Sequence, residues 1–252
     1  MGGGAAEIPP TQEVTVSTSK EPARISGMFD AIAARYDTLN HVLSAGLDVR
    51  WRRKLVKALA LTERDRVLDV CTGTADLAMA AARGHGAAGR KVVGVDFSGA
   101  MLDIGRAKLA RAGLTSRVHL VRGDATALPL PTESFDAAMI AFGIRNVVDT
   151  RQGLAELHRV LRRDGRLAIL EFGLPKDRRL GALYRSYFRH ILPRIGRLVS
   201  RHSDAYEYLP ASVSEFPSGA AFAGLLTQAG FSGARHVSMA MGAVYLYLAH
   251  RP

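Results

Sequence analysis

The sequence predicts an α/β protein with a seven-stranded, mostly parallel sheet, and three observations support this fold class. After residue 65, short apolar runs alternate with segments of helix length, which is typical of parallel strands covered by helices on both faces. Two apolar runs near the C-terminus are too close together for a helical crossover, which predicts an antiparallel last strand. The composition, 48% hydrophobic over 252 residues, fits one domain, and a single cysteine excludes an internal disulfide framework.

The elements can be placed in chain order. Residues 1–24, rich in Gly, Pro, Thr and Ser, predict a disordered tail before a single domain over residues 25–252. Apolar residues at helical spacing predict an N-terminal helical cap over residues 25–62, broken near Ser44-Ala45-Gly46. Strands are expected at residues 67–70, 92–96, 118–121, 137–141, 167–171, 234–237 and 243–249.

The chain is strongly basic, with 34 Lys and Arg against 23 Asp and Glu and a formal net charge of +11. Such a balance predicts an anionic partner, either nucleic acid or an acidic lipid surface. Residues 180–199 combine a broad apolar face with many arginines, which favours a basic amphipathic lid on an anionic membrane. The alternative is a core helix with a solvated arginine face. Without a signal peptide or an apolar run of spanning length, a cytoplasmic protein, peripheral at most, is expected.

Polar residues follow the first three predicted strands, where ligands bind in open α/β sheets. Gly73 allows close backbone approach, and Thr74 is expected to begin a helix whose free N–H groups face the ligand. Asp96, 23 residues beyond Gly73, has the spacing of a carboxylate that binds a ribose. Asp124 and Ala125 follow the third strand, where a carboxylate can accept from an adenine amine. One nucleoside with a charged tail, such as S-adenosylmethionine (SAM), fits this set; the alternative makes Gly73 a plain turn and Asp96 a helix-cap residue.

The order of these features resembles the class I SAM-dependent methyltransferases. Longer blocks resemble a narrower family, the ubiquinone/menaquinone biosynthesis C-methyltransferases (UbiE type, including demethylmenaquinone methyltransferases). These blocks are residues 36–44, 51–52, 142–147, 159–165, 170–172, 192–196, 205–210 and 212–217, in order across residues 26–250. The chain departs from the family pattern at Asp48 (usually His), Ala75 (usually Gly) and Ala141 (usually Ser).

The resemblance implies a Rossmann-like fold with N-terminal helices and a helical lid insertion over residues 174–217. It implies methyl transfer from SAM, which leaves as S-adenosylhomocysteine (SAH), to a ring carbon of a polyprenylated quinol. The substrate would be demethylmenaquinol, 2-methoxy-6-polyprenyl-1,4-benzoquinol, or both. The alternatives are a C- or O-methyltransferase of another lipophilic phenol or aromatic metabolite, an RNA methyltransferase, and a scaffold protein with the same fold. Because the loop after the fourth strand lacks the motif that clamps a flipped base, no nucleic-acid partner is expected.

The resemblance also implies roles for individual residues. Arg145 and Asn146 are the expected catalytic pair, which would hold and polarise a ring hydroxyl; the alternative for Arg145 is a surface ion pair with Asp149 or Glu156. Asn40, Phe142 and Tyr206 would contact the substrate with them. The residues expected to bind the cofactor are Tyr36, Asp69, Gly73, Thr74, Asp96, Phe97, Asp124, Ala125 and Ala141. No metal is expected, and a homodimer is left open.

Overall fold

The structure is a computed structural model that describes residues 44–84, 87–175 and 204–252, together with eight residues of the preceding segment. Those eight are residues 27, 30, 31, 33, 37, 38, 40 and 41, all helical. The expected tail over residues 1–24 and the amphipathic stretch over residues 180–199 lie outside the described residues.

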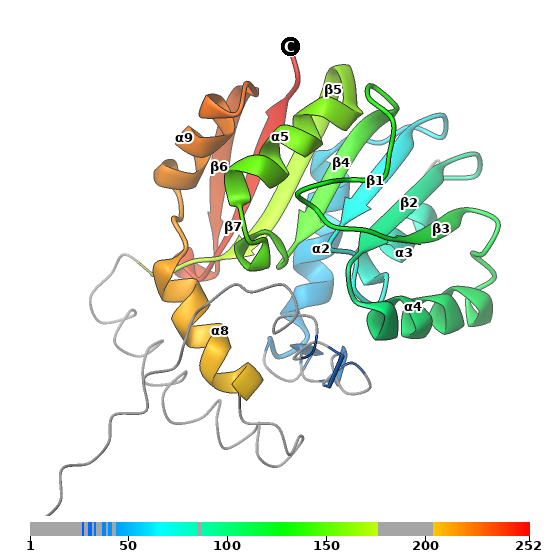
Figure 1. Ribbon diagram of the computed structural model, residues 1–252, viewed down its shortest axis with the longest axis horizontal. Helices are drawn as coiled ribbons and strands as arrows, with labels where there is room; N and C mark the ends of the chain where they lie inside the picture. Colours follow the sequence, from blue (N-terminus) through cyan, green and yellow to red (C-terminus); the bar gives the residue numbers. More distant parts are fainter. Residues whose placement is uncertain are drawn as a thin grey trace, which may run out of the picture.

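The strands are β1 (Arg66–Val70), β2 (Lys91–Asp96), β3 (Val118–Arg122), β4 (Phe135–Ala141), β5 (Leu161–Phe172), β6 (Ser232–Met239) and β7 (Val244–His250). They form one seven-stranded sheet in the order β3-β2-β1-β4-β5-β7-β6 (Figure 1). The pairs among the first five strands are parallel, whereas β7 is antiparallel to both β5 and β6. The predicted strands and the antiparallel last strand are therefore confirmed.

The helices are α2 (Leu47–Ala58), α3 (Asp76–Arg83), α4 (Gly99–Arg111), α5 (Thr150–Val160), α8 (Asp204–Glu215) and α9 (Ala220–Gln228), with short 3-10 turns η1 (Ile144–Asn146) and η3 (Ala240–Gly242). They cover both faces of the sheet (Figure 1). One hydrophobic cluster joins α2, α3 and α4 to the sheet, and the other joins α5 and α9 to it. None of the helices in the described ranges is long and apolar enough to cross a membrane.

Local structure differs from the sequence prediction at two places. The helix after the glycine loop begins at Asp76 rather than Thr74, because Ala75 takes a left-handed conformation (φ 69°) and ends the loop. Strand β5 begins earlier than expected: Leu161 pairs with Phe135 across a bulge before the regular ladder. The segment around Tyr206 belongs to helix α8. The expected break at residues 44–46 is confirmed as a turn.

Candidate active site

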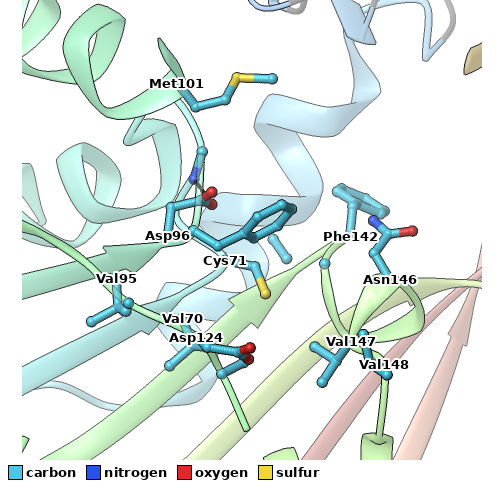
Figure 2. A pocket seen from close by; sticks show the side chains of 16 residues that line it. Val70, Cys71, Val95, Asp96, Met101, Asp124, Phe142, Asn146, Val147 and Val148 are labelled. Atoms are coloured by element: carbon cyan, nitrogen blue, oxygen red, sulfur yellow. Dashed lines mark hydrogen bonds between the residues drawn. The ribbon is translucent and has the colours of Figure 1, made fainter. Parts of the chain in front are cut away.

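A pocket opens at the carboxyl ends of β1 to β4, where ligands bind in sheets of this topology. Figure 2 shows the side chains of Asp96 and Asp124 on one side of this pocket and those of Phe142 and Asn146 on the other. Of the residues predicted to bind the cofactor, those that line it are Gly73, Asp96, Phe97, Asp124, Ala125 and Ala141. The structure therefore brings together four strand ends whose residues, from Gly73 to Ala141, span about seventy positions of the sequence.

Asp96 is held in place by two backbone donors. Its Oδ2 accepts a hydrogen bond from the Gly73 N–H at 2.8 Å, and its Oδ1 accepts one from the Ser98 N–H at 2.9 Å. Burial raises the pKa of this carboxyl group, and the hydrogen bonds from Ser98 and Gly73 oppose that shift. The cap of α4 is Ser98, whose hydroxyl accepts from the Met101 N–H. The cap residue of α4 is thus Ser98, while Asp96, two residues earlier, accepts from the Ser98 N–H and also lines the pocket.

The glycine loop is unusually rich in left-handed residues. Cys71, Gly73 and Ala75 have φ values of 55°, 54° and 69°. Gly143 of the neighbouring loop must lack a side chain here, because a Cβ at that position would collide with the Cβ of Cys71. Burial raises the pKa of the Cys71 thiol well above its usual value, so at neutral pH it is an uncharged part of the pocket wall.

Asp69 is hydrogen-bonded to the glycine loop and does not line the pocket. Its Oδ2 accepts a hydrogen bond from the Thr72 hydroxyl at 2.6 Å, and the residue is 1% exposed. Burial raises the pKa of Asp69 to about 7. Its contacts are thus those of a group that orders the loop.

Asp124 offers one free carboxylate oxygen to the pocket. Its Oδ1 accepts from both the N–H and the hydroxyl of Thr126, each at 2.8 Å. Among the described residues, no hydrogen bond reaches Oδ2. Because the first oxygen fixes the orientation of the group, the second is positioned to accept from a ligand.

Arg145 lies in η1, directly after β4, and its guanidinium is paired inside the protein. Nη1 donates to Glu171 Oε1 and to the Phe142 carbonyl, both at 2.7 Å, and the guanidinium lies 5.3 Å from the centre of the Phe172 ring. The alternative of a surface ion pair with Asp149 or Glu156 is wrong. Asp149 caps α5, and Glu156 pairs with the neighbouring arginine on the same helix.

Asn146 brings a buried polar atom to the wall of the pocket. It is 8% exposed and lines the pocket beside Phe142, yet its Oδ1 has no hydrogen-bond partner among the described residues. Arg145 Nε is likewise buried without a partner in the described part of the chain. Arg145, unlike Asn146, does not line the pocket. Buried polar atoms are nearly always hydrogen-bonded, so the unpartnered Oδ1 of Asn146 at the pocket wall is available to a bound molecule.

Other predicted residues lie away from the pocket or outside the described chain. The hydroxyl of Thr74 donates to Asp37, and Asn40 is half-buried without lining the pocket. Tyr36 and the side chain of Tyr206 lie outside the described residues. Asp48 is buried against Arg52, so this departure from the family pattern does not face the pocket.

The sequence predicts no site role for three positions that the structure connects to the site: Glu171 and Asp37, which lie in the blocks 170–172 and 36–44, and Lys108. Each is defined by a partner far along the chain, 26 residues for Glu171 and Arg145, and 71 residues for Asp37 and Lys108. No group of three or more His, Cys, Asp or Glu side chains suited to a metal ion occurs in the described ranges.

The strand order and this pocket define the fold of the class I SAM-dependent methyltransferases. A SAM-dependent methyltransferase from Thermotoga maritima, described as a possible histamine N-methyltransferase, matches with a TM-score of 0.62 and 21% identity over 90% of this chain and 100% of that chain. The putative methyltransferase bound to the Trm112 activator of Haloferax volcanii matches with a TM-score of 0.66 and 18% identity, over 90% of this chain and 97% of that chain. These likenesses confirm the predicted fold.

Sequence comparison identifies the family. The model of the ubiE/COQ5 methyltransferase family matches residues 16–251, and the chain belongs to this family. The ubiquinone/menaquinone biosynthesis C-methyltransferase of Citrifermentans bemidjiense is 46% identical over 91% of this chain and 97% of its own length. The demethylmenaquinone methyltransferase of Thermus thermophilus is 44% identical over 89% of this chain and 100% of its own length. The chain is therefore a methyltransferase, as predicted, and SAM is the methyl donor of its class.

Proposed function

We propose that this enzyme methylates a ring carbon of a polyprenylated quinol, namely demethylmenaquinol, 2-methoxy-6-polyprenyl-1,4-benzoquinol, or both. The names of its relatives support this substrate class. The observation that carries the proposal is the buried, unpartnered Oδ1 of Asn146 in a pocket whose neighbouring walls are Phe142 and Val147. An apolar wall with one hydrogen-bond acceptor suits an aromatic ring that bears a hydroxyl group.

The residues at the strand ends fit the cofactor. Asp96 is oriented by Gly73 and Ser98, and Asp124 keeps one oxygen free, so two carboxylates with fixed directions are available to the ribose and the adenine of SAM. Phe97, Ala125 and Ala141 supply apolar contact beside them. When bound, SAM supplies a methyl group activated by its positive sulfonium.

In the proposed reaction, Asn146 accepts a hydrogen bond from the ring hydroxyl and fixes the ring in the pocket. Holding the ring carbon in line with the methyl group provides much of the rate acceleration. Arg145 does not line the pocket, so its role in the proposal is to supply positive charge beside Asn146, which favours negative charge developing on the ring. A guanidinium stays protonated, so the proton that leaves the ring carbon goes to water rather than to Arg145.

A lipophilic substrate places the enzyme at a membrane surface while the protein itself remains cytoplasmic. Helix α2 supports this placement, because its exposed side chains include four cations: Arg50, Arg53, Lys54 and Lys57. Trp51 of the same helix lies against Phe142 at the pocket, with ring centroids 6.2 Å apart. The basic helix is thus next to the substrate side of the site. Nucleic acid is not part of the proposal, and a homodimer stays a prediction.

A second candidate is methyl transfer to another lipophilic phenol or aromatic metabolite. It is favoured by Ala141, which lines the pocket at a position where the family pattern has Ser. Losing that hydroxyl removes one polar contact to either ligand, and a less polar acceptor would tolerate the loss.

The test is incubation of the purified enzyme with SAM and a reduced short-prenyl demethylmenaquinol, and separately with the benzoquinol, followed by mass spectrometry of the extracted lipid. The proposal predicts a mass gain of one methyl group in place of hydrogen on at least one quinol. No gain on either, with SAM binding shown by calorimetry, would move the assignment to the second candidate.

A further inference from the structure

Lys108 of α4 contacts three side-chain oxygens, one from the N-terminal segment and two from the glycine loop and the start of α3. Its Nζ lies 2.7 Å from Asp37 Oδ2 and 3.1 Å from Thr74 Oγ1, and it also contacts Asp76 Oδ1. A lysine ammonium has three N–H donors, so these contacts use all of them. The side chains of Lys108, Asp37 and Asp76 are 20%, 33% and 24% exposed. The cluster is therefore partly shielded from water, unlike an ordinary surface ion pair.

Two of these partners flank a strained residue. Thr74 and Asp76 are the neighbours of Ala75, whose φ of 69° is unfavourable for a residue with a Cβ. The family pattern has glycine at this position, which adopts the left-handed region without that penalty. This chain therefore needs contacts that hold the loop in a conformation its own sequence disfavours.

Helix α4 touches the loop at two points, three residues apart on one face. At Gly105 the helix comes so close that an added Cβ would lie 3.3 Å from the Cβ of Ala75 and 2.9 Å from Leu120 Cδ1. Lys108 then reaches over the same loop to Thr74 and Asp76. The helix thus packs against Ala75 and fixes the residues on both sides of it.

The same cluster joins the N-terminal helix to the cofactor site. Thr74 accepts from Lys108 and donates to Asp37 Oδ1 at 2.5 Å. Asp30, a helical residue seven positions before Asp37, accepts from the Ser98 hydroxyl at 2.5 Å. Thr74 and Ser98 each follow directly after a residue that lines the pocket, Gly73 and Phe97. The N-terminal helix is therefore fastened at the rim of the cofactor pocket.

From these contacts we infer that Lys108 is a positioning residue for the cofactor. It holds the left-handed loop at Ala75 and anchors the N-terminal helix through Asp37, and it does so without lining the pocket itself. Cofactor affinity then depends on a charge that never touches the cofactor.

The test measures SAH affinity by calorimetry in Lys108→Met and in Lys108→Met made in an Ala75→Gly background. Loss of the ammonium is expected to weaken SAH binding roughly tenfold, which corresponds to about 1.4 kcal/mol. In the glycine background the same loss should be less than about threefold, because glycine keeps the loop conformation without the clamp. The KM for SAM should rise with little change in kcat, and Lys108→Arg should restore most of the affinity.

A matched control lies on the same helix. The side chains of Asp103 and Arg106 form an exposed ion pair and are 75% and 53% exposed. Asp103→Asn breaks this pair and is expected to leave SAH affinity unchanged. If Lys108→Met lowers the melting temperature, Asp37→Asn provides a milder variant that keeps the contact with Asp76. SAH affinity within about twofold of wild type in both variants would overturn the inference. An equal loss for Lys108→Met in the alanine and glycine backgrounds would overturn it too.

Discussion

Removing the charge from Glu171 is expected to destabilise the protein strongly, because this carboxylate compensates the buried guanidinium of Arg145. The two side chains are 0% and 8% exposed and lie 2.7 Å apart. The carboxylate also accepts from the backbone N–H of Arg145 at 3.3 Å and of Phe172 at 2.8 Å. In Glu171→Gln, one acceptor oxygen becomes an NH₂ group that only donates. One donor then loses its acceptor, and the guanidinium loses its counter-charge.

The loss of stability in Glu171→Gln depends on the contacts that Arg145 keeps. Breaking a buried ion pair by removing one partner costs about 3–5 kcal/mol. Arg145 keeps the Phe142 carbonyl at 2.7 Å and the Phe172 ring at 5.3 Å, which favours the lower end of that range. For a chain of this length, each kcal/mol lowers Tm by roughly 2–4 °C, so the expected fall is roughly 6–12 °C.

Scanning calorimetry and urea titration measure this effect. The double variant Arg145→Met/Glu171→Gln removes both charges and should regain most of the lost stability, because no buried charge is left alone. Its methyl transfer should stay impaired, since the guanidinium is absent. A Glu171→Gln protein that melts within about 2 °C of wild type would refute the role of the pair in stability. So would a double variant less stable than Glu171→Gln alone.

Three other predictions concern the cofactor, pH and the membrane. Asp96→Ala should weaken SAM binding by roughly tenfold or more, because it removes an oriented charge and unties Gly73 from Ser98; unchanged affinity by calorimetry would remove Asp96 from the cofactor site. Burial raises the pKa of Asp69 to about 7 from 3.8, so the folded state holds an extra proton between these values and this group lowers stability as pH rises through them. Asp69→Asn should therefore gain stability relative to wild type between about pH 4 and about pH 8, by at most about 4 kcal/mol in urea titrations, and an identical pH dependence in both proteins would contradict this. Glutamine at the exposed cations of α2 (Arg50, Arg53, Lys54 and Lys57) should weaken sedimentation with acidic vesicles by about 1 kcal/mol per charge; equal binding by the variant would exclude α2 as the contact.

The sheet and the pocket-lining residues at its strand ends could be predicted from the sequence because they depend on local patterns. Apolar runs mark buried parallel strands, and the residue after each run lies at the binding edge of the sheet. Asp96 and Asp124 are therefore found by position alone. Parallel strands in one sheet place their carboxyl ends at the same edge, so these residues meet there whatever the sequence of the intervening helices.

The rest depends on contacts between residues that are distant in the sequence. The sequence does not show that Arg145 pairs with Glu171, which is 26 residues away. Asp149 and Glu156 are nearer in the sequence and are equally acidic, so only the fold decides the partner. Lys108 looks like any charge on a solvated helix face. The helix after the glycine loop begins later than the sequence predicts because Ala75 adopts a left-handed conformation, which an alanine does not signal.

The most direct test of the proposed function is to find where the methyl group goes. The enzyme would be incubated with SAM labelled in its methyl group with a stable carbon isotope and with reduced demethylmenaquinol, and the product examined by NMR. The account predicts a labelled methyl signal at the chemical shift of an aryl carbon substituent. A signal at the shift of a methyl ether, or label in no quinol while SAM is bound, would contradict it.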